Sequence, residues 1–476
     1  MNDIDLCFLS AIDAANAIRQ KRLSPVTLVN AIIDRIDRID PKLNAFCTPA
    51  FDSARQTAKV AEAAVKRGDK LGPLHGVPVA VKDVVATRGI RTTWGSRLNA
   101  DNVPTEDAPS VERLKAAGAI VLGKTNTPEY GWKGATDNPL FGPTFNPWNL
   151  ELTPGGSSGG TGAAIAAGFA PLGIGTDGGG SIRIPASFCG IYGLKPTFGR
   201  IPYFPASLAD TLSHLGPMTR TVRDAALMMD VIAGPDRRDR HSLPADGTDY
   251  LALTSGGIEG LRVAWSPDLG YSRVDPEVKR ITEKAAKRFS ELGCHVEEAS
   301  PDIAGILGPG QHPIYFILFN AGFASMISSH TKEEQGIMDP AFLRSAEGWG
   351  QRSLIDAGRA NIGRVQLWDT VQGFFERFDL LLTPTLPVTA FGARLHGAPE
   401  IAGHKVDPGD LSWTPFTYPF NLTGQPAATV PCGFSESGLP VGLQIVGRRL
   451  DDVSVLRASA AFEEIAPWAH RRPPID

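Results

Sequence analysis

In the N-terminal part of the chain, apolar side chains recur every three or four positions, which is the spacing of one face of an α-helix. Residues 11–20 and 26–39 follow this pattern, and each run is preceded by a serine, Ser10 or Ser24, that can cap the first helical turn. A third run, residues 52–68, ends in a glycine, a typical helix terminator. The chain is therefore expected to begin with helices.

Further along, strand-like segments alternate with helical ones. Residues 76–85 are apolar on both faces, as expected of a central strand that is covered from both sides. The helical runs 109–118 and 158–168 alternate with the strand-like runs 119–125 and 171–177. This alternation predicts an α/β fold, with a mixed β-sheet sandwiched between helices on both faces.

The second half of the chain has a more variable pattern. Residues 275–293 are predicted to be helical, and a loop rich in glycine and proline is expected around residues 305–312. Apolar segments broken by glycine and proline predict three more strands, within residues 378–384, 421–433 and 438–447. We find no internal repeat and no linker long enough to divide the chain.

Composition is ordinary for a soluble globular protein, with 42% apolar and 21% charged residues. The net charge is only -4 and no basic block occurs, which argues against a nucleic-acid partner. Five scattered cysteines without metal-binding spacing indicate reduced thiols in a cytoplasmic protein. The uncharged run 152–176 is too rich in glycine to span a membrane. We expect no metal and no cofactor.

Two short motifs match the chain formally. Residues 118–125 fit the phosphate-binding pattern GxxxxGK[ST], but the residues between the glycines predict a strand instead of a loop. Nucleotide binding is therefore disfavoured, and Lys124 is interpreted as structural or exposed. Residues 155–159 fit GxSxG, yet Pro154 interrupts the strand that a nucleophile elbow requires. For a Ser-His-Asp triad, no later histidine stands in a setting that singles it out.

A third set of residues, Lys82, Ser157 and Ser181, is harder to explain by a structural role alone. Ser157 and Ser181 lie in the most glycine-rich loops, and Lys82 closes the apolar strand upstream. Taken singly, such a lysine is usually solvated and such serines usually form turns. Together they can form a nucleophile, because serine must lose its proton to a base as it attacks. Lysine can be that base if burial lowers its pKa from ~10.4 to about 7–8.

At these residues the sequence resembles the amidase signature family of serine hydrolases, and its bacterial stand-alone amidases in particular. The resemblance extends from the helix after Ser24 to Trp468 and is weakest between Gly234 and Arg377. It implies one domain over residues 1–476, in which the variable region 235–375 contributes to the substrate pocket. The matching motifs are LHGVPVAVKD (74–83), GKTNTPEYG (123–131), FGPTFNPWN (141–149), PGGSSGG (154–160), GTDGGGSIRIPA (175–186), GLKPTFGR (193–200) and PFNLTGQPA (419–427).

The resemblance implies a catalytic role for each of Lys82, Ser157 and Ser181. Ser181 would be the acylated nucleophile, Ser157 would relay its proton, and Lys82, entering as a neutral amine, would be the terminal base. The peptide bond between Gly156 and Ser157 is expected to be cis. Backbone N–H groups are expected to form an oxyanion hole at Gly178, Gly179, Gly180 and Ser181. The loop is expected to be supported by Ser158, Asp177 and Arg183, while His75 is interpreted as structural.

The implied activity is hydrolysis of a carboxylic amide C–N bond through an acyl-enzyme, with water and a small-molecule amide as the reaction partners. Aromatic residues near the motifs predict a pocket for aryl or hydrophobic amides: Tyr130, Trp132, Phe141, Phe145, Phe204, Trp413 and Phe416, with Tyr203 and Tyr418 nearby. Carbamate or ester hydrolysis by the same chemistry stays open, as does homodimerisation. A glutamine-dependent amidotransferase subunit is a further alternative, against which Ile184 stands where that subunit typically has glutamine.

Overall fold

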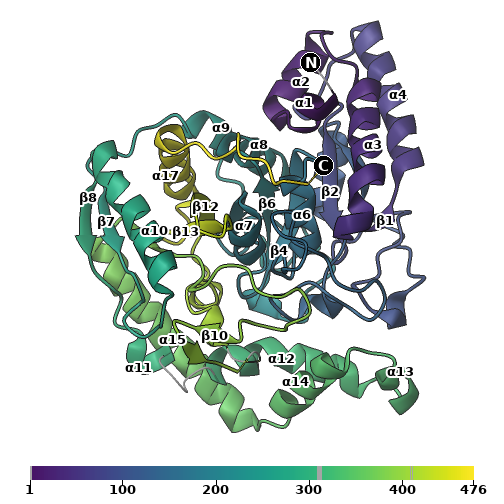
Figure 1. The fold of residues 1–476 in the computed structure, drawn as a ribbon. Coiled ribbons are helices and arrows are strands. Elements are labelled where there is room, and N and C mark those ends of the chain that lie inside the picture. Colours follow the sequence, from purple (N-terminus) through teal and green to yellow (C-terminus); the bar gives the residue numbers. More distant parts are fainter. Residues whose placement is uncertain (1–2, 308–312, 408, 410, 476) are drawn as a thin grey trace.

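The computed structural model describes residues 3–307, 313–407, 409 and 411–475. Within them, a mixed eleven-stranded sheet runs through the molecule in the order β1-β3-β2-β4-β6-β5-β12-β13-β9-β7-β8 (Figure 1). The strands are β1 (Phe46–Pro49), β2 (Pro78–Lys82), β3 (Ile120–Thr125), β4 (Leu172–Asp177), β5 (Tyr192–Lys195), β6 (His214–Thr219), β7 (Arg262–Trp265), β8 (His295–Glu298), β9 (Leu380–Pro384), β12 (Ala427–Phe434) and β13 (Pro440–Gly447), and β10 (Glu400–Ile401) pairs with β11 (His404–Lys405) apart from them.

Helices surround this sheet. They are α1 (Asp3–Cys7), α2 (Ala11–Arg19), α3 (Pro25–Leu43), α4 (Phe51–Arg67), α5 (Pro109–Ala116), α6 (Gly159–Ala166), α7 (Arg183–Cys189), α8 (Val222–Ile232), α9 (Tyr250–Leu253), α10 (Pro276–Lys287), α11 (Ala304–Leu307), α12 (Pro313–Ser328), α13 (Lys332–Gly336), α14 (Pro340–Gly350), α15 (Leu354–Arg377), α16 (Pro419–Leu422) and α17 (Asp452–Ile465). Short 3-10 helices occur at η1 (Arg97–Asn99), η2 (Glu129–Gly131), η3 (Asp210–Leu212), η4 (Arg288–Leu292) and η5 (Leu411–Trp413).

The predicted N-terminal helices are confirmed together with their caps. The Ser10 hydroxyl accepts the N–H of Asp13 at the start of α2, and the Ser24 hydroxyl accepts the N–H of Val26 at the start of α3. Helix α4 ends at Gly68, whose φ of 81° is readily adopted only by glycine. The short strand β1 between these helices was not predicted, because four residues carry too little periodicity.

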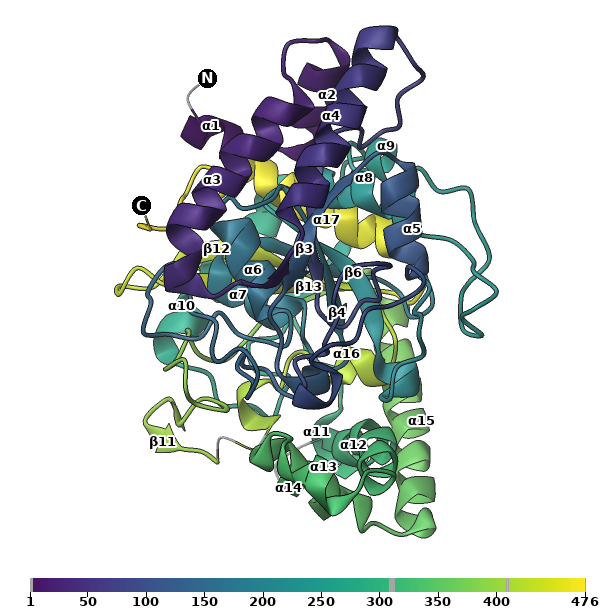
Figure 2. The ribbon, with the colours of Figure 1, turned by 90° about the vertical axis from the view of Figure 1, so that its right-hand side faces the viewer.

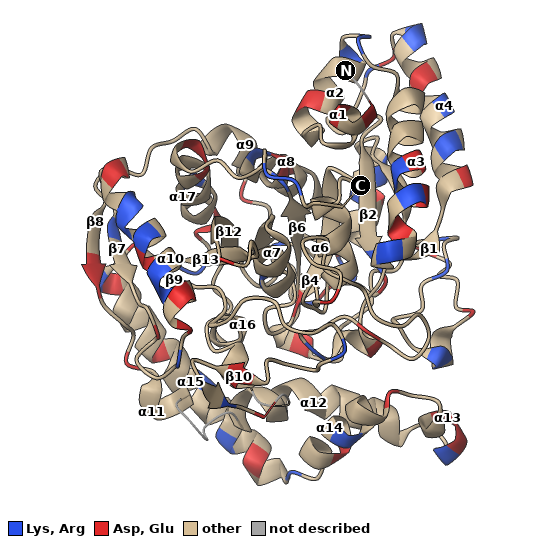
Figure 3. Cartoon of the chain, viewed as in Figure 1, with Lys and Arg blue, Asp and Glu red and all other residues tan. Residues whose placement is uncertain are grey.

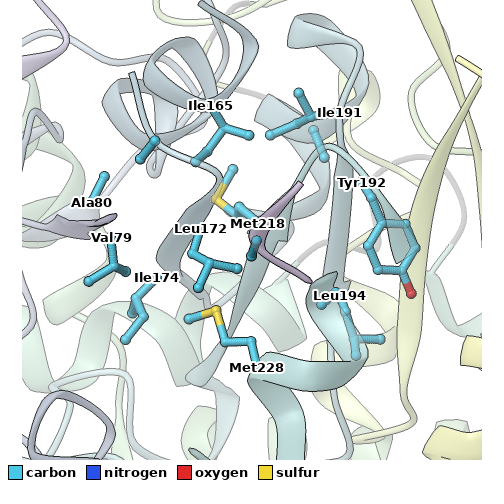
Figure 4. Packing of buried hydrophobic residues seen from close by; sticks show 14 of the residues in the cluster. Val79, Ala80, Ile165, Leu172, Ile174, Ile191, Tyr192, Leu194, Met218 and Met228 are labelled. Atoms are coloured by element: carbon cyan, nitrogen blue, oxygen red, sulfur yellow. The ribbon is translucent and has the colours of Figure 1, made fainter. Parts of the chain in front are cut away.

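Helices cover both faces of the sheet, as the alternating pattern predicts. Helices α6 and α7 contact each other and pack on the central strands, and α8 and α17 form a second contacting pair that packs on β5, β6, β12 and β13. Figure 4 shows the resulting core, in which Ile165 of α6 and Met228 of α8 lie on either side of Leu172 and Met218. Strands β2, β3, β4 and β6 are buried along their whole length.

The N-terminal helices and the α11–α15 group stand at opposite ends of the molecule in both views (Figures 1 and 2). An apolar cluster that includes Phe323, Phe342, Leu367 and Phe416 holds the α11–α15 group against the core. The loop predicted at residues 305–312 is wrong for its first residues, which α11 includes, and residues 308–312 lie outside the described residues.

Charge is unevenly distributed over these elements. Lysine, arginine, aspartate and glutamate lie along α3, α4 and α10 (Figure 3), whereas α6 and α12 contain none of them. In the described part of the chain, no helix combines the length and the apolar character needed to cross a membrane. The five cysteines are free thiols.

Candidate active site

Two neighbouring parallel strands bring the predicted residues together. Strands β2 and β4 pair in parallel, so their carboxyl ends lie at the same edge of the sheet. Lys82 is the last residue of β2, and Asp177 is the last residue of β4. The turn after β4 carries Ser181 and leads into α7, while Ser157 lies in the loop that leads into α6. The pairing of β2 with β4 thus brings Lys82 close to the turn that carries Ser181, and hydrogen bonds hold the Ser157 loop beside both.

The Lys82 amine is completely buried and has two hydroxyl partners. Its Nζ lies 2.6 Å from Ser157 Oγ and 2.7 Å from Thr176 Oγ1. Burial lowers the pKa of Lys82 well below its usual value, and the negative charge of Asp177 opposes that effect only in part. A lysine that loses its proton so readily has a lone pair with which to accept one. Thr176 was not predicted, although it lies in the motif beside Asp177.

The peptide bond between Gly156 and Ser157 is cis, as predicted. The Ser157 hydroxyl faces Gly131, where an added Cβ would lie 3.1 Å from Ser157 Oγ and 4.0 Å from Lys82 Nζ. Gly131 also has a φ of 74°, so conformation and space both require glycine there. Gly131 also lines the cavity that Ser181 lines, so it lies next to both predicted serines.

Ser158 is hydrogen-bonded to the turn that carries Ser181 and to β4. Its N–H donates to the Ser181 carbonyl at 3.1 Å. Its hydroxyl donates to the Thr176 carbonyl at 3.1 Å and accepts the Thr176 N–H at 3.2 Å. Three hydrogen bonds from one residue therefore fix the loop before α6 against β4 and the turn after it.

A buried ion pair lies beneath the turn that carries Ser181. Arg183 Nη2 lies 2.9 Å from Asp177 Oδ1, and neither side chain is exposed. The guanidinium also donates to the Thr417 carbonyl, to Gln444 and to Asn421, whose amide donates back to Asp177. Burial alone would raise the pKa of Asp177, but Arg183 and Asn421 hold it well below its usual value. The sequence motifs contain Asn421, but nothing in them indicated Gln444.

The prediction that the Gly180 N–H belongs to an oxyanion hole is wrong. This N–H donates to Asp177 Oδ1 at 2.7 Å, so it is already occupied inside the turn. Gly180 instead shapes the turn, with a φ of 132° and space so tight that an added Cβ would lie 2.5 Å from Thr417 Oγ1. The physical reason is that the buried, charged Asp177 carboxylate must be satisfied by hydrogen-bond donors, and the Gly180 N–H is one of them.

The neighbouring N–H groups have no such partner. Within the described residues, no acceptor is hydrogen-bonded to the N–H of Gly178, Gly179 or Ser181. The Gly178 carbonyl accepts the Tyr315 hydroxyl at 3.2 Å, and the Gly179 carbonyl accepts the Thr417 hydroxyl at 2.7 Å. These bonds fix the peptide planes of the turn. Free N–H groups on a fixed turn are what an oxyanion hole requires.

Ser181 opens into a cavity of about 550 Å³. Gly131, Gly179 and Ser181 in its lining come from the predicted motifs, and much of its wall comes from α12 and α14. The aromatic lining residues are Trp132, Tyr315, Phe316, Phe319, Trp349 and Trp413, and the polar ones include Lys133, Asn320, Arg344, Ser345 and His396. Four of the six aromatic side chains thus belong to the variable region, in which no sequence motif indicated a binding role.

Of the seven aromatic residues predicted to line the substrate pocket, Trp132 and Trp413 line the cavity at Ser181. The other five lie elsewhere, because proximity to a motif in sequence does not fix the side of the loop on which a ring lies. Tyr130 and Tyr203 line a separate cavity. The ring of Phe141 lies under the Arg91 guanidinium, and the ring of Phe204 lies under that of Arg238. Phe145 lies beside the end of α3, and Phe416 and Tyr418 are buried in the core.

The competing motifs have structural explanations. Residues 120–125 form β3, so no phosphate-binding loop exists there. Lys124 is fully buried and donates to the Val85 carbonyl and to Thr87, so it is structural and not exposed. In the described part of the chain, no histidine is hydrogen-bonded to Ser157 or Ser181. The His75 ring contacts the Ala61 carbonyl at 3.0 Å.

The sheet edge thus holds a buried lysine in contact with one glycine-flanked serine, and a second glycine-flanked serine lines the neighbouring cavity. The chain belongs to the amidase signature family, whose amidase model matches residues 27–456. It is 43% identical to an acylamidase of Rhodococcus erythropolis, over 99% of this chain and 98% of that protein. The protein is therefore a hydrolase that acts on the C–N bonds of linear amides.

Two further relatives have names that point to different substrates. The chain is 37% identical to a glutamyl-tRNA(Gln) amidotransferase subunit of Moorella thermoacetica, with 99% of each chain covered. The solved structure of a bacterial aryl acylamidase of this family matches with a TM-score of 0.91 and 35% identity, over 97% of each chain. The family is thus established, while these relatives differ in what their names say they act on.

Proposed function

We propose that this amidase hydrolyses aryl or otherwise hydrophobic amides, with Ser181 as the nucleophile, Ser157 as the proton relay and Lys82 as the base. The observation that carries this proposal is the 2.6 Å contact between the buried Lys82 amine and Ser157, beside a cavity that exposes Ser181. A buried amine can take the serine proton through Ser157 without a histidine or a metal.

In the acylation step, Ser181 Oγ attacks the amide carbonyl while its proton passes through Ser157 to Lys82. The N–H groups of Gly178, Gly179 and Ser181 then face the developing oxyanion. The tetrahedral intermediate collapses as the proton returns through Ser157 to the leaving nitrogen. This return matters because an amine anion is a poor leaving group.

Water completes the cycle by the same route. It attacks the acyl ester on Ser181 and gives its proton through Ser157 to Lys82, and Ser181 recovers a proton as the acid departs. The Asp177 carboxylate, held by Arg183, keeps the turn in place throughout, since it accepts the N–H groups of Gly180 and Ile182 on the two sides of Ser181. Ser158 holds the relay serine loop against the same turn.

The aromatic wall supports aryl or hydrophobic substrates, because rings and alkyl chains gain most from leaving water for such a surface. The names of the acylamidase relatives agree with this choice. Ile184 also lines the cavity, and an apolar side chain there suits a polar glutamine substrate poorly. Carbamates and esters need the same acyl chemistry and are the competing substrates for the same site.

Three predictions about organisation accompany this function. We propose that the chain acts as one domain in which residues 235–375 complete the pocket, which the cavity residues on α12 and α14 support. A cytoplasmic location and a homodimeric assembly stay predictions from the sequence. Light scattering of the purified protein measures the assembly directly.

The test is release of 4-nitroaniline from 4-nitroacetanilide by the wild type and by Ser181→Ala. We expect Ser181→Ala to lower kcat/KM by at least about 10³-fold, because the nucleophile is lost. His75→Ala is the control and should keep most of the activity, since the His75 ring bonds to the Ala61 carbonyl on α4 and does not line the cavity at Ser181. Retained turnover in a folded Ser181→Ala protein would remove Ser181 from the mechanism.

A further inference from the structure

Lys195 is a buried lysine that the proposed mechanism does not use. It is the last residue of β5, and its side chain has no exposed surface. Its amine donates to the carbonyls of Gln425 and Pro196. The same Nζ lies 3.4 Å from Nε2 of His214, the first residue of β6, which is buried as well. The His214 ring is therefore held from one side by a buried amine.

The partners of this ring determine which of its nitrogens carries the proton. His214 Nδ1 lies 2.9 Å from the Leu212 carbonyl and 3.2 Å from the Asp177 carbonyl, and carbonyl oxygens can only accept. Nδ1 must therefore carry a proton. Burial and the neighbouring Lys195 lower the pKa of His214 well below its usual value, so the ring is neutral and Nε2 has no proton. Nε2 thus accepts from Lys195, while Nδ1 donates to the two carbonyls.

His214 reaches the turn that carries Ser181 because its strand pairs with the strand before that turn. Strands β4 and β6 are antiparallel, and Asp177 lies directly opposite His214. The Asp177 carbonyl accepts the Nδ1–H of His214 and also the side-chain amide of Asn421, which lies at 2.9 Å. Two side-chain donors from different elements therefore hold this one carbonyl.

The Asp177 carbonyl and the Gly178 N–H belong to the same peptide unit. This unit is not among the cis peptides of the described residues, so its N–H points opposite to its carbonyl. Donors that hold the carbonyl therefore fix the direction of the N–H. They also polarise the peptide, which makes the N–H a stronger donor. Within the described residues, the Gly178 N–H has no acceptor, and the proposed mechanism uses it to bind the oxyanion.

We propose that His214 is a positioning residue of the oxyanion hole, an inference that rests on the proposed function. Its Nδ1–H acts with the Asn421 amide to hold the Asp177 carbonyl, which keeps the Gly178 N–H directed at the developing oxyanion. Lys195 keeps the ring in the tautomer that can donate in this way. His214 is not among the described residues that line the cavity at Ser181, so it acts through the turn and not on the substrate.

Two substitutions of His214 test this role. His214→Phe removes the Nδ1–H and keeps a ring, whereas His214→Asn keeps an N–H donor close to the position of Nδ1. We expect His214→Phe to lower kcat for 4-nitroacetanilide about tenfold with KM unchanged, which is less than the ~10²–10³-fold loss on removal of an oxyanion donor itself. His214→Asn should recover most of that loss.

Inhibition by a phenyl-substituted trifluoromethyl ketone separates positioning from a structural role. Such a ketone forms a tetrahedral adduct with the nucleophile, and the adduct places an oxyanion in the hole. Its inhibition constant should rise about tenfold in His214→Phe and return toward the wild-type value in His214→Asn. His241→Phe is the matched control, because His241 packs on the same Phe198 ring but contacts Asp210 instead of Asp177. It should leave kcat and inhibition near the wild-type values.

Equal losses in His214→Phe and His214→Asn, or a KM that rises as kcat falls, would show a merely structural role and overturn the proposal. Unchanged kcat and inhibition in both variants would overturn it as well. Nitrogen NMR of the histidine-labelled wild type does not depend on the folding of a variant, and a proton on Nε2 of His214 would also overturn it. A ketone that forms no adduct with Ser181 in the wild type would instead contradict the proposed function, so the two failures can be told apart.

Discussion

Lys82 has no exposed surface, and an amine in that position loses its charge more readily than one in water. Because only the neutral amine can accept the serine proton, activity should be lost as the pH falls through the lowered pKa of Lys82. We expect kcat/KM to rise with pH along an acid limb whose midpoint lies well below 10.5, the usual lysine value. A pH profile with 4-nitroacetanilide measures this limb.

Lys124 is the control for the assignment of the acid limb to Lys82. It is also fully buried, and burial lowers its pKa to about 8, so its titration could produce a similar limb. Lys124→Met should keep the acid limb of the wild type, and Lys82→Met should lack measurable turnover. If the limb disappears in Lys124→Met, or if it lies in the usual range of lysine, Lys82 is not the base.

At the same residue scale, Asp177 stabilises the folded chain through Arg183. Asp177→Asn leaves the buried guanidinium uncompensated, which should lower the free energy of unfolding by about 3–5 kcal/mol at neutral pH. The pKa of Asp177 is lowered on folding, so its stabilisation is complete above the unfolded value of ~3.9 and is lost as the pH falls through the folded one.

Urea unfolding at neutral and acidic pH checks this prediction. The difference between the wild type and Asp177→Asn should narrow in acid. Glu283→Gln is the control, because Glu283 forms an exposed pair with Lys287 and its loss should change stability little. A gap that is equally wide at both pH values would contradict the role of the Asp177 charge.

At the scale of elements, α12 brings an aromatic surface to the site that the motifs do not encode. Phe319→Ala should raise KM for 4-nitroacetanilide about tenfold, because the ring of the bound substrate loses an aromatic neighbour. Turnover of a small aliphatic amide such as acetamide should change less. Steady-state kinetics with both substrates measures the difference.

Phe141→Ala is the matched control on a motif loop. Phe141 was predicted from its sequence position to line the pocket, but its ring packs under Arg91 and not in the cavity at Ser181. Phe141→Ala should therefore leave the KM for 4-nitroacetanilide near the wild-type value. A larger effect of Phe141→Ala than of Phe319→Ala would contradict the assignment of the cavity wall to α12.

The elements around the site were largely predictable, because their signals are local. Ser24 caps α3 and Gly68 ends α4 through contacts within a few residues, and the apolar run before Lys82 indicates its buried strand. The resemblance pointed to residues 235–375 as part of the pocket, but the side chains that line the cavity were not predictable, since α12 reaches Ser181 only through tertiary packing. The Gly180 N–H was assigned wrongly for a different reason: its bond to Asp177 spans only three residues, but the motif does not show whether the turn directs that N–H to the carboxylate or to the substrate.

At the scale of the whole molecule, the site exists only because distant parts of the chain converge on one sheet edge. Lys82 ends β2, Ser181 follows β4, and Asn421 near the C-terminal strands binds the ion pair beneath the turn. An apolar cluster holds the α11–α15 group against the core, and α12 and α14 of that group line the cavity at Ser181. Catalysis should therefore depend on the intact chain.

The central claim is that the acyl group is carried by Ser181, and mass spectrometry tests it directly. The wild type is mixed with 4-nitroacetanilide, quenched in acid during turnover and digested. We predict an acetyl group on the peptide that contains Ser181, and its absence in Ser181→Ala. Turnover with the acetyl group on Ser157 or another residue, or an adduct that persists in Ser181→Ala, would contradict the account.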